Sequence, residues 1–143
     1  MLSEAKEKNL IGLKINKKMI TKQTPSEPWP GDFSCSDNQL TSLEGAPASV
    51  GGNFNCSDNQ LTSLEGIHKQ LKKMNGTFYA RSNPIKSHVI GILLIPGCKK
   101  VYLDNKQVEE IMNRHLQSPF GNLRVLECQS EMLDAGLEDW ADL

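Results

Sequence analysis

A mixed α/β fold, built as a stack of repeated parallel strands, is predicted by a sequence that occurs twice in the chain. The segment 33–45, FSCSDNQLTSLEG, recurs at 54–66 as FNCSDNQLTSLEG, with one substitution and an offset of 21 residues. A third, degenerate copy follows after three additional residues and places Phe78, Ala80, Asn83 and Ile85 at the same offsets. Self-similarity at a period of about 20 to 29 residues is typical of arrays in which each repeat contributes one strand.

Each copy fits the leucine-rich-repeat template L-x-x-L-x-L-x-x-N-x-L. The first copy puts Phe33 and Cys35 at the inward strand positions and Asn38 where the chain leaves the strand. We expect the Phe side chains to form a buried column and the Asn side chains to form a ladder that hydrogen-bonds open backbone groups. The sequence therefore predicts a short leucine-rich-repeat solenoid with a curved parallel sheet of four to five strands.

The chain is predicted to be a single domain over 1–143, with an atypical rung at each end of the array. A capping rung is expected over 1–29, where Leu10, Leu13 and Ile15 echo the repeat, and the repeats proper over 30–104. The last rung carries Cys98, Val101 and Leu103, and the returns between strands are short, so the back of the sheet should be thin. Solenoids need such ends because an open end exposes unpaired backbone and the stacked core.

A helical cap is predicted over 105–143. Asp104 or Asn105 can cap a helix that runs to about Leu116, after which Pro119, Phe120 and Gly121 end it. A second helix is expected over 127–143, with Leu133, Leu137 and Trp140 on one face; the segment 123–128 fits a further strand or part of a helix equally well. The apolar run 89–96 is interpreted as a buried strand or core segment, and the pair Glu109-Glu110 as a solvated helix face.

The run over 26–66 resembles a known family. Its segments SLEGAP and VGG-x-F-x-C-S are similar to the repeat of small leucine-rich-repeat proteins common in bacteriophage genomes, and the tail segments IGILLIPGCKKVYLDNKQVEEIMNRHL and ECQSEMLDAGLEDWADL resemble their tail. The segment NQLTSL is distantly similar to the repeats of bacterial effector ubiquitin ligases, whose large catalytic domain does not fit into 143 residues. The phage resemblance implies a cytoplasmic, phage-encoded binding protein.

Composition and motifs exclude several classes of function. With 38% hydrophobic residues, a formal net charge of -1 and no apolar run near the about 20 residues of a membrane span, we expect a cytoplasmic protein with no membrane partner. No P-loop, G-x-S-x-G or H-E-x-x-H motif occurs, so an enzyme is not expected. The four cysteines, at 35, 56, 98 and 128, form no C-x-x-C pair and lie far from any His, so we expect free core thiols and neither metal nor cofactor.

Charge and strand-face residues give the functional hypothesis. Formal charges of +4, -6, +7 and -6 fall on 1–23, 24–66, 67–124 and 127–143, and small polar residues on the outward strand positions give way to aromatic and basic ones. Because Tyr and Arg are enriched at interface hot spots, this face is the predicted protein-binding site, although exposed strands also favour Tyr for its β-propensity alone. Its residues are Ser34, Asn55, Tyr79, Arg81, Lys100 and Tyr102.

The functional hypothesis is a non-catalytic protein-binding module. The phage resemblance implies that it occupies a host protein, as an inhibitor of a bacterial defence system such as a CRISPR or other anti-phage nuclease. Trp140 and its helix are a second candidate surface for a protein partner. Two alternatives stay open: a nucleic-acid binder that uses the basic block 67–124, with Tyr79 and Tyr102 stacking on bases, and a virion structural or assembly component. The sequence leaves the oligomeric state open.

Overall fold

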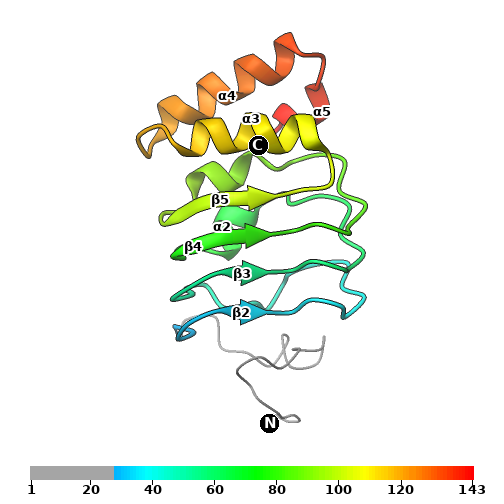
Figure 1. Cartoon of the computed structure of the whole chain (residues 1–143), viewed down its shortest axis with the longest axis vertical. Helices are drawn as coiled ribbons and strands as arrows, with labels where there is room; N and C mark the ends of the chain where they lie inside the picture. The colour runs from blue at the N-terminus through cyan, green and yellow to red at the C-terminus, as the bar shows by residue number, and fades with distance from the viewer. Residues whose placement is uncertain (1–27) are drawn as a thin grey trace.

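The computed structural model describes residues 28–143 and shows a mixed α/β architecture (Figure 1). The strands are β2 (Phe33–Ser34), β3 (Phe54–Asn55), β4 (Gly76–Tyr79) and β5 (Cys98–Tyr102). They form one four-stranded parallel sheet in the order β2-β3-β4-β5, which follows the chain. The predicted mixed class and parallel sheet are therefore confirmed. The capping rung expected over 1–29 lies, except for its last two residues, outside the described part of the chain.

A column of aromatic rings runs through the core behind the sheet. Phe33 pairs with Phe54, and Phe54 with Phe78, with ring centroids 5.3 and 5.2 Å apart. Trp29 extends the column edge-on to Phe33, and Val101 of β5 takes the next place after Phe78. The three Phe rings are at most 1% exposed, so each contributes about 1.5–3 kcal/mol of burial. The predicted register of the three copies is confirmed.

The Asn ladder joins successive repeats where the chain leaves each strand. The Oδ1 atom of Asn59 accepts hydrogen bonds from two backbone N–H groups of the first repeat, both at 2.9 Å. Its Nδ2 donates to the carbonyls of Cys35 and Cys56 at 3.1 and 2.9 Å. Asn83 makes the equivalent contacts one repeat later. Each buried amide thus satisfies polar backbone groups of two neighbouring repeats, as the pattern predicts.

The returns between strands are short. They contain α2 (Ile67–Gln70), which uses the three additional residues of the third copy, and the 3-10 helix η1 (Ile90–Leu94). The run 89–96 is therefore a core segment but not a strand: it folds around the helical turn η1, and all of its residues except Leu94 and Pro96 are buried. The sheet is not curled, in contrast to the predicted curvature. Thin returns explain this difference, because they make the back of the stack little wider than the sheet.

Helix α3 (Lys106–Leu116) closes the edge of the sheet at β5. As predicted, Asn105 caps it by accepting a hydrogen bond from the Val108 N–H at 3.0 Å. Two polar side chains of α3 and one from its C-cap residue then form hydrogen bonds with the backbone groups along the free edge of β5 and of the residue after it. Glu109 accepts from the Leu103 N–H, Asn113 both accepts from and donates to the backbone of Val101, and Gln117 donates to the Lys99 carbonyl.

The remaining cap consists of α4 (Asn122–Asp134) and α5 (Glu138–Ala141). It differs from the single second helix expected over 127–143. Helix α4 begins five residues earlier, so 123–128 is helical and forms no strand. The helical path is interrupted between α4 and α5 at Gly136, whose φ of +78° favours glycine.

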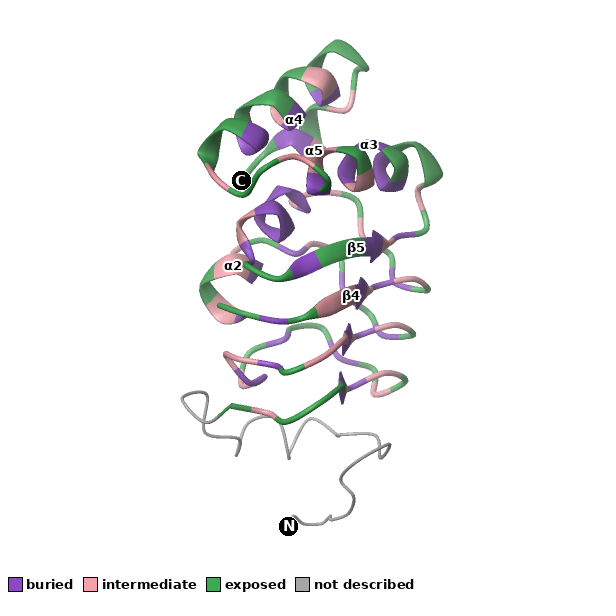
Figure 2. Cartoon of the chain, turned by 60° about the vertical axis from the view of Figure 1, so that its left-hand side comes forward, coloured by how far each residue is buried: buried purple, intermediate pink, exposed green. Residues whose placement is uncertain are grey.

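The face that α4 turns to the core also differs from the predicted one. Leu133 is 55% exposed, while Val125, Cys128 and Met132 are buried. Figure 2 shows the buried residues of α4 on its side toward α3 and the exposed ones on the outside. Periodicity alone predicted the wrong stripe because α4 carries two apolar stripes, and only one packs on the core.

Arg124 holds α4 in place through backbone oxygens. The residue is 5% exposed, and its guanidinium donates to the carbonyls of Leu93, Leu116 and Ser118 at 2.7–3.2 Å. Leu93 lies near the end of η1 and Leu116 ends α3, where helix carbonyls carry partial negative charge. Burial lowers the pKa of Arg124. One buried cation therefore connects η1, α3 and α4.

Candidate functional site

A row of four side chains crosses the outer face of the sheet. Parallel register places Ser34 beside Asn55, Asn55 beside Tyr79, and Tyr79 beside Tyr102. All four are half-buried. The row runs along the stack from β2 to β5, so its composition changes from small and polar to aromatic in the order of the chain.

Two stacked tyrosines form the upper end of this row. The rings of Tyr79 and Tyr102 lie 5.3 Å apart with planes 15° from parallel. Two cations lie over the ring of Tyr102: the Lys100 ammonium at 4.9 Å and the Arg81 guanidinium at 4.6 Å from its centroid. Such contacts are each worth about 0.5–1 kcal/mol at exposed sites. The structure thus brings four of the predicted residues into one cluster, which we call the tyrosine cluster (Tyr79, Arg81, Lys100, Tyr102).

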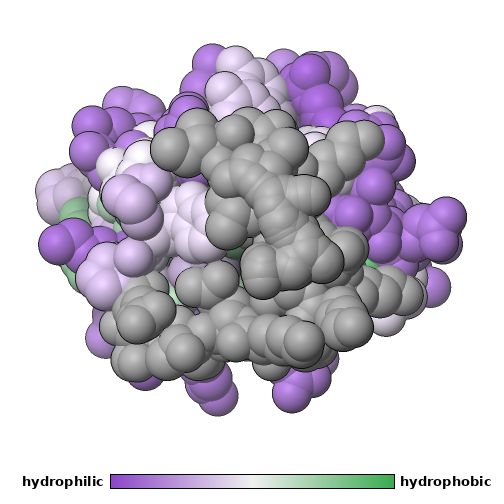
Figure 3. Space-filling view, turned by 90° about the horizontal axis from the view of Figure 1, so that it is seen from below, coloured by the Kyte–Doolittle hydropathy of each residue, from purple (hydrophilic) through white to green (hydrophobic). Residues whose placement is uncertain are grey.

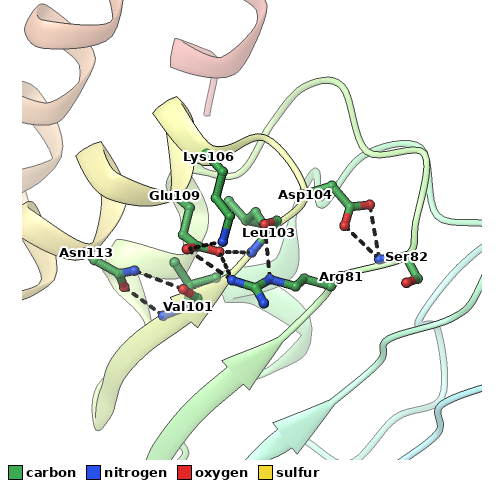
Figure 4. Close-up of polar contacts among 8 residues, drawn as sticks. All are labelled: Arg81, Ser82, Val101, Leu103, Asp104, Lys106, Glu109 and Asn113. Atoms are coloured by element: carbon green, nitrogen blue, oxygen red, sulfur yellow. Dashed lines mark hydrogen bonds and ion pairs between the residues drawn. The ribbon is translucent and has the colours of Figure 1, made fainter.

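Arg81 has a second set of contacts, inside the molecule (Figure 4). Its Nη2 donates to both carboxylate oxygens of Glu109 at 3.0 and 3.2 Å, and its Nε donates to the Leu103 carbonyl at 3.4 Å. Arg81 therefore ties β4 to α3 and β5 while its guanidinium packs on Tyr102. Arg81 therefore positions the tyrosine pair, and its guanidinium is already engaged within the chain.

Glu109 is buried, which corrects the expectation of a solvated helix face. Its carboxylate is at the centre of the contacts in Figure 4, between Arg81, Lys106 and the Leu103 N–H, and the residue is 8% exposed. Burial alone would raise the pKa of Glu109, but the hydrogen bonds from Leu103 and Arg81 and the charges of Arg81 and Lys106 outweigh it and lower the pKa. Glu110, its neighbour, is exposed as expected.

Ser34 and Asn55 form the lower end of the row, and their side chains make hydrogen-bond contacts with residues two positions further along the chain. The Ser34 hydroxyl lies 3.1 Å from that of Ser36, and Asn55 Oδ1 accepts from the Ser57 N–H at 2.9 Å. Trp140 is not part of the row. It lies on α5, half-buried against the hydrophobic core, in the helical cap. The structure therefore divides the predicted site residues into three groups: the tyrosine cluster, the polar pair Ser34 and Asn55 that continues its row, and Trp140 in the helical cap.

Three residues that organise this region were missed from the sequence: Glu109, Asn113 and Gln117. Their four-residue spacing is a detectable signal, because it places three hydrogen-bonding side chains on one stripe of a helix that directly follows a strand. Such a stripe, running beside the apolar face of Val108, Ile111 and Met112, is consistent with a helix that pairs with a sheet edge. Their partners on β5 could not be assigned without the helix direction.

Other surface features offer little chemistry. A shallow depression of about 330 Å³ lies between the turns that follow β2 and β3, lined by groups such as Ser42, Glu44, Ser63 and Glu65. No group of three metal-ligating side chains occurs within residues 28–143. The helices of that same region are all too short or too polar to cross a bilayer.

The tyrosine cluster is thus the most distinctive arrangement of side chains on the outer face of the sheet. Comparison with protein families, with curated proteins and with solved structures gives no match for this chain.

Proposed function

We propose that the chain is a non-catalytic protein-binding module of the leucine-rich-repeat type, in which the stacked repeats form a short solenoid. The register of Phe33, Phe54 and Phe78 and the ladder contacts of Asn59 and Asn83 support the repeat assignment. In such arrays each repeat contacts only its neighbours, so the outer face of the sheet stays open along the stack. An open, rigid face is what a partner protein can bind.

The binding face is centred on Tyr79, Lys100 and Tyr102. The observation that carries this proposal is the stacked, half-buried tyrosine pair on rigid strands. A ring held by stacking and by neighbouring cations loses little conformational freedom when a partner covers it. Tyrosines fixed in this way are the kind of residue that contributes most at interface hot spots.

The partner is expected to present carboxylates. Lys99 and Lys100 are exposed on β5, the Lys100 ammonium lies over the Tyr102 ring, and the block 67–124 carries a formal charge of +7. Glu109, the acid that contacts Arg81, is buried and already paired with it, and the carboxylate of the exposed Asp104 accepts from the Ser82 N–H. The field at the cluster is therefore positive, which favours encounter with an acidic protein surface.

The resemblance to phage repeat proteins extends this proposal to a biological role. A phage-encoded, cytoplasmic binding protein acts by occupying a host protein, and a nuclease of an anti-phage defence system, such as a CRISPR effector, is the specific candidate. In that role, binding alone inhibits the target, so no catalytic group is needed.

Single-stranded nucleic acid is a second candidate ligand. The stacked Tyr79–Tyr102 pair with Lys100 over the Tyr102 ring is the observation that favours it, since such proteins combine aromatic stacking with positive charge. The two tyrosine faces that touch each other are, however, unavailable to a base. Protein binding uses the ring edges and the lysines and does not need those faces.

A capture experiment tests the proposal. Immobilised wild-type chain is compared with Tyr79→Ala/Lys100→Glu in a bacterial lysate, with Lys86→Glu as the control for charge, because Lys86 is exposed and belongs to the same basic block. Arg81 is left intact because its loss would disturb the contact between β4 and α3. We expect a host protein that is captured by the wild type and by Lys86→Glu but lost with the double variant. Equal capture by all three chains would refute the sheet face as the binding site.

The nucleic-acid candidate makes a different demand. It predicts that an oligothymidine strand binds with an affinity that falls about tenfold or more between about 50 and 200 mM salt, and that Tyr102→Ala removes this binding. If capture of a host protein persists after nuclease treatment and the chain does not bind oligothymidine, the result supports the protein-binding function.

A further inference from the structure

The large exposed hydrophobic side chains of residues 28–143 all lie in the helical cap. They are Phe120 (56%), Leu123 (67%), Leu126 (61%), Leu133 (55%) and Leu143 (48%). The sheet and its returns, over 28–104, contribute none of them. In the view from below, the described residues that are visible are mostly hydrophilic (Figure 3). Contiguous exposed apolar surface is a feature of interaction sites, and three of these side chains lie on the single helix α4.

Three of these leucines form one stripe along α4. Leu123, Leu126 and Leu133 occupy the first, fourth and eleventh places of a two-heptad pattern, with Ser130 at the eighth. This is the a-d-a-d spacing of a helix seam that packs against another helix. The stripe is distinct from the face that α4 buries, and it lies on the outer side of the helix, drawn mostly as exposed in Figure 2.

The charges beside the stripe are of one sign. Glu127 and Asp134 follow the d positions, at the places that heptad notation calls e, and both are exposed. The opposite flank carries the neutral residues Asn122 and Gln129, and Gln129 donates to the Ala141 carbonyl. Residues 127–143 contain six acids and no base. Residues at e and g select the partner of a helix seam through their charge.

We propose that this α4 seam, the stripe of Leu123, Leu126 and Leu133 with Glu127 and Asp134 beside it, binds an amphipathic helix of a partner protein whose apolar stripe is flanked by Lys or Arg. A second copy of the chain fits less well. An antiparallel pair of α4 helices would place the acidic flanks against each other, and a parallel pair would place acids against the neutral Asn122 and Gln129. The α4 seam is independent of the tyrosine cluster, so the chain has two separate surfaces for partners.

Two synthetic helical peptides of about 21 residues serve as probes. Both carry Leu at a and d; one carries Lys at e and g, and the other carries Glu there. Binding to the full chain is measured by fluorescence anisotropy at about 50 mM salt, where surface charges are weakly screened. We expect the Lys peptide to bind about tenfold or more tightly than the Glu peptide.

Variants of α4 then test the seam itself. Leu123→Gln/Leu126→Gln removes two exposed leucines without touching the core, and should weaken the Lys peptide about tenfold or more. Glu127→Lys/Asp134→Lys should reverse the preference toward the Glu peptide. Glu44→Lys/Glu65→Lys, which changes the same charge on exposed turns far along the sequence, should leave the preference unchanged. Thermal unfolding checks that each variant is folded.

Several outcomes would overturn the proposal. Failure of both peptides to bind, equal binding of the two peptides, or Lys-peptide binding that survives Leu123→Gln/Leu126→Gln each exclude the α4 seam as a site for a basic helix. Sedimentation equilibrium addresses the second copy: a wild-type dimer that Leu126→Gln converts to a monomer would show self-association instead. Retained binding of the Lys peptide by Tyr79→Ala/Lys100→Glu separates this surface from the sheet face.

Discussion

At the scale of single residues, the ladder Asn side chains connect the repeats. Asn59 is 7% exposed and contacts backbone groups of the first and second repeats, at both its oxygen and its nitrogen. An Ala at this position would leave several of those groups without partners in the core. The cost of stranding buried polar groups exceeds the net gain of an ordinary hydrogen bond.

Asn59→Ala is therefore expected to lower the free energy of unfolding by about 1–3 kcal/mol. Chemical denaturation monitored by circular dichroism measures it. Gln60→Ala, at the exposed neighbouring position, is the control and should change the midpoint little. An Asn105→Ala variant would not serve as a control, because Asn105 caps α3 and its loss would itself destabilise the chain. Equal midpoints for wild type and Asn59→Ala would mean that the ladder does not stabilise the fold.

The cysteines are core residues whose thiols are poor nucleophiles. All four are free and buried. Burial raises the pKa of Cys35 and of Cys128 to about 12 and that of Cys98 to about 11, and it also raises the pKa of Cys56. Reaction requires the thiolate, so little of it forms near neutral pH in the folded chain.

We expect iodoacetamide at pH 8 to leave the native chain largely unmodified and to add four groups after unfolding, without any reductant. Intact mass spectrometry reads both states. Because all four thiols are free, unfolding should expose the complete set. Fewer than four adducts after unfolding would reveal a disulfide, and rapid native labelling would show that the core opens readily.

At the scale of elements, α3 replaces a fifth strand at the edge of the sheet. Glu109, Asn113 and Gln117 are four residues apart, a rise of about 6 Å along a helix, while their backbone partners Leu103, Val101 and Lys99, on β5 and just after it, alternate at about 6.6 Å. The two spacings match closely enough for three successive contacts. A sheet edge covered in this way cannot pair with another chain.

Asn113→Ala should open this edge. Its amide makes two hydrogen bonds to Val101, at 2.8 and 3.0 Å, so we expect a loss of about 1–3 kcal/mol and faster hydrogen exchange at the Val101 amide. Hydrogen exchange followed by NMR measures both effects. Gln107→Ala, at an exposed position of the same helix, is the control. Unchanged protection of Val101 would show that the helix covers β5 without needing this contact.

The contact between α3 and α4 depends on Glu131. Its carboxylate accepts from Arg114 at 2.6 and 2.8 Å and lies 2.8 Å from His115 Nε2. The hydrogen bonds from Arg114 and then from His115 lower the pKa of Glu131 from 4.5 to about 2. A carboxylate with a depressed pKa stabilises the fold above its unfolded pKa, and this stabilisation is lost as the pH falls toward the folded value.

Glu131→Gln should therefore be less stable than the wild type at pH 7, and the difference should shrink between about pH 5 and pH 2. Thermal unfolding across this range measures it. Glu127→Gln, on the exposed side of the same helix, should show no comparable convergence. A Glu131→Gln deficit that stays constant down to pH 2 would mean that the ionised carboxylate is not what stabilises the contact.

At the scale of the whole molecule, the repeat register could be predicted and the cap only in part. The positions of Phe54 and Phe78 follow from Phe33 because the period of the copies fixes the pairing of parallel strands. The apolar run 89–96 has no periodicity, so its sequence does not distinguish a strand from a buried helical turn. For α4, the helix that buries Cys128 and Met132 is held by contacts of Arg124 with Leu93, 31 residues away, and of Glu131 with Arg114, 17 residues away, which no local pattern specifies.

The candidate site was predictable in position but not in its inner contacts. Strand alternation places Tyr79 and Tyr102 on the outer face, and the repeat register places them side by side. The pairing of Arg81 with Glu109 joins residues 28 apart and depends on the direction in which α3 crosses β5, which no local pattern specifies. That pairing decides which residues of the tyrosine cluster can contact a partner without disturbing the fold.

The most direct test of the proposed function is the dissociation constant for a captured host protein. Tyr79→Ala/Lys100→Glu should bind it with a loss of about 2 kcal/mol or more, roughly thirtyfold, because two hot-spot contacts are removed from a rigid face. Calorimetric titration at fixed salt should give wild-type affinity for Lys86→Glu and for Leu123→Gln/Leu126→Gln. If the double variant of the sheet face binds as tightly as the wild type, the tyrosine cluster is not the binding site.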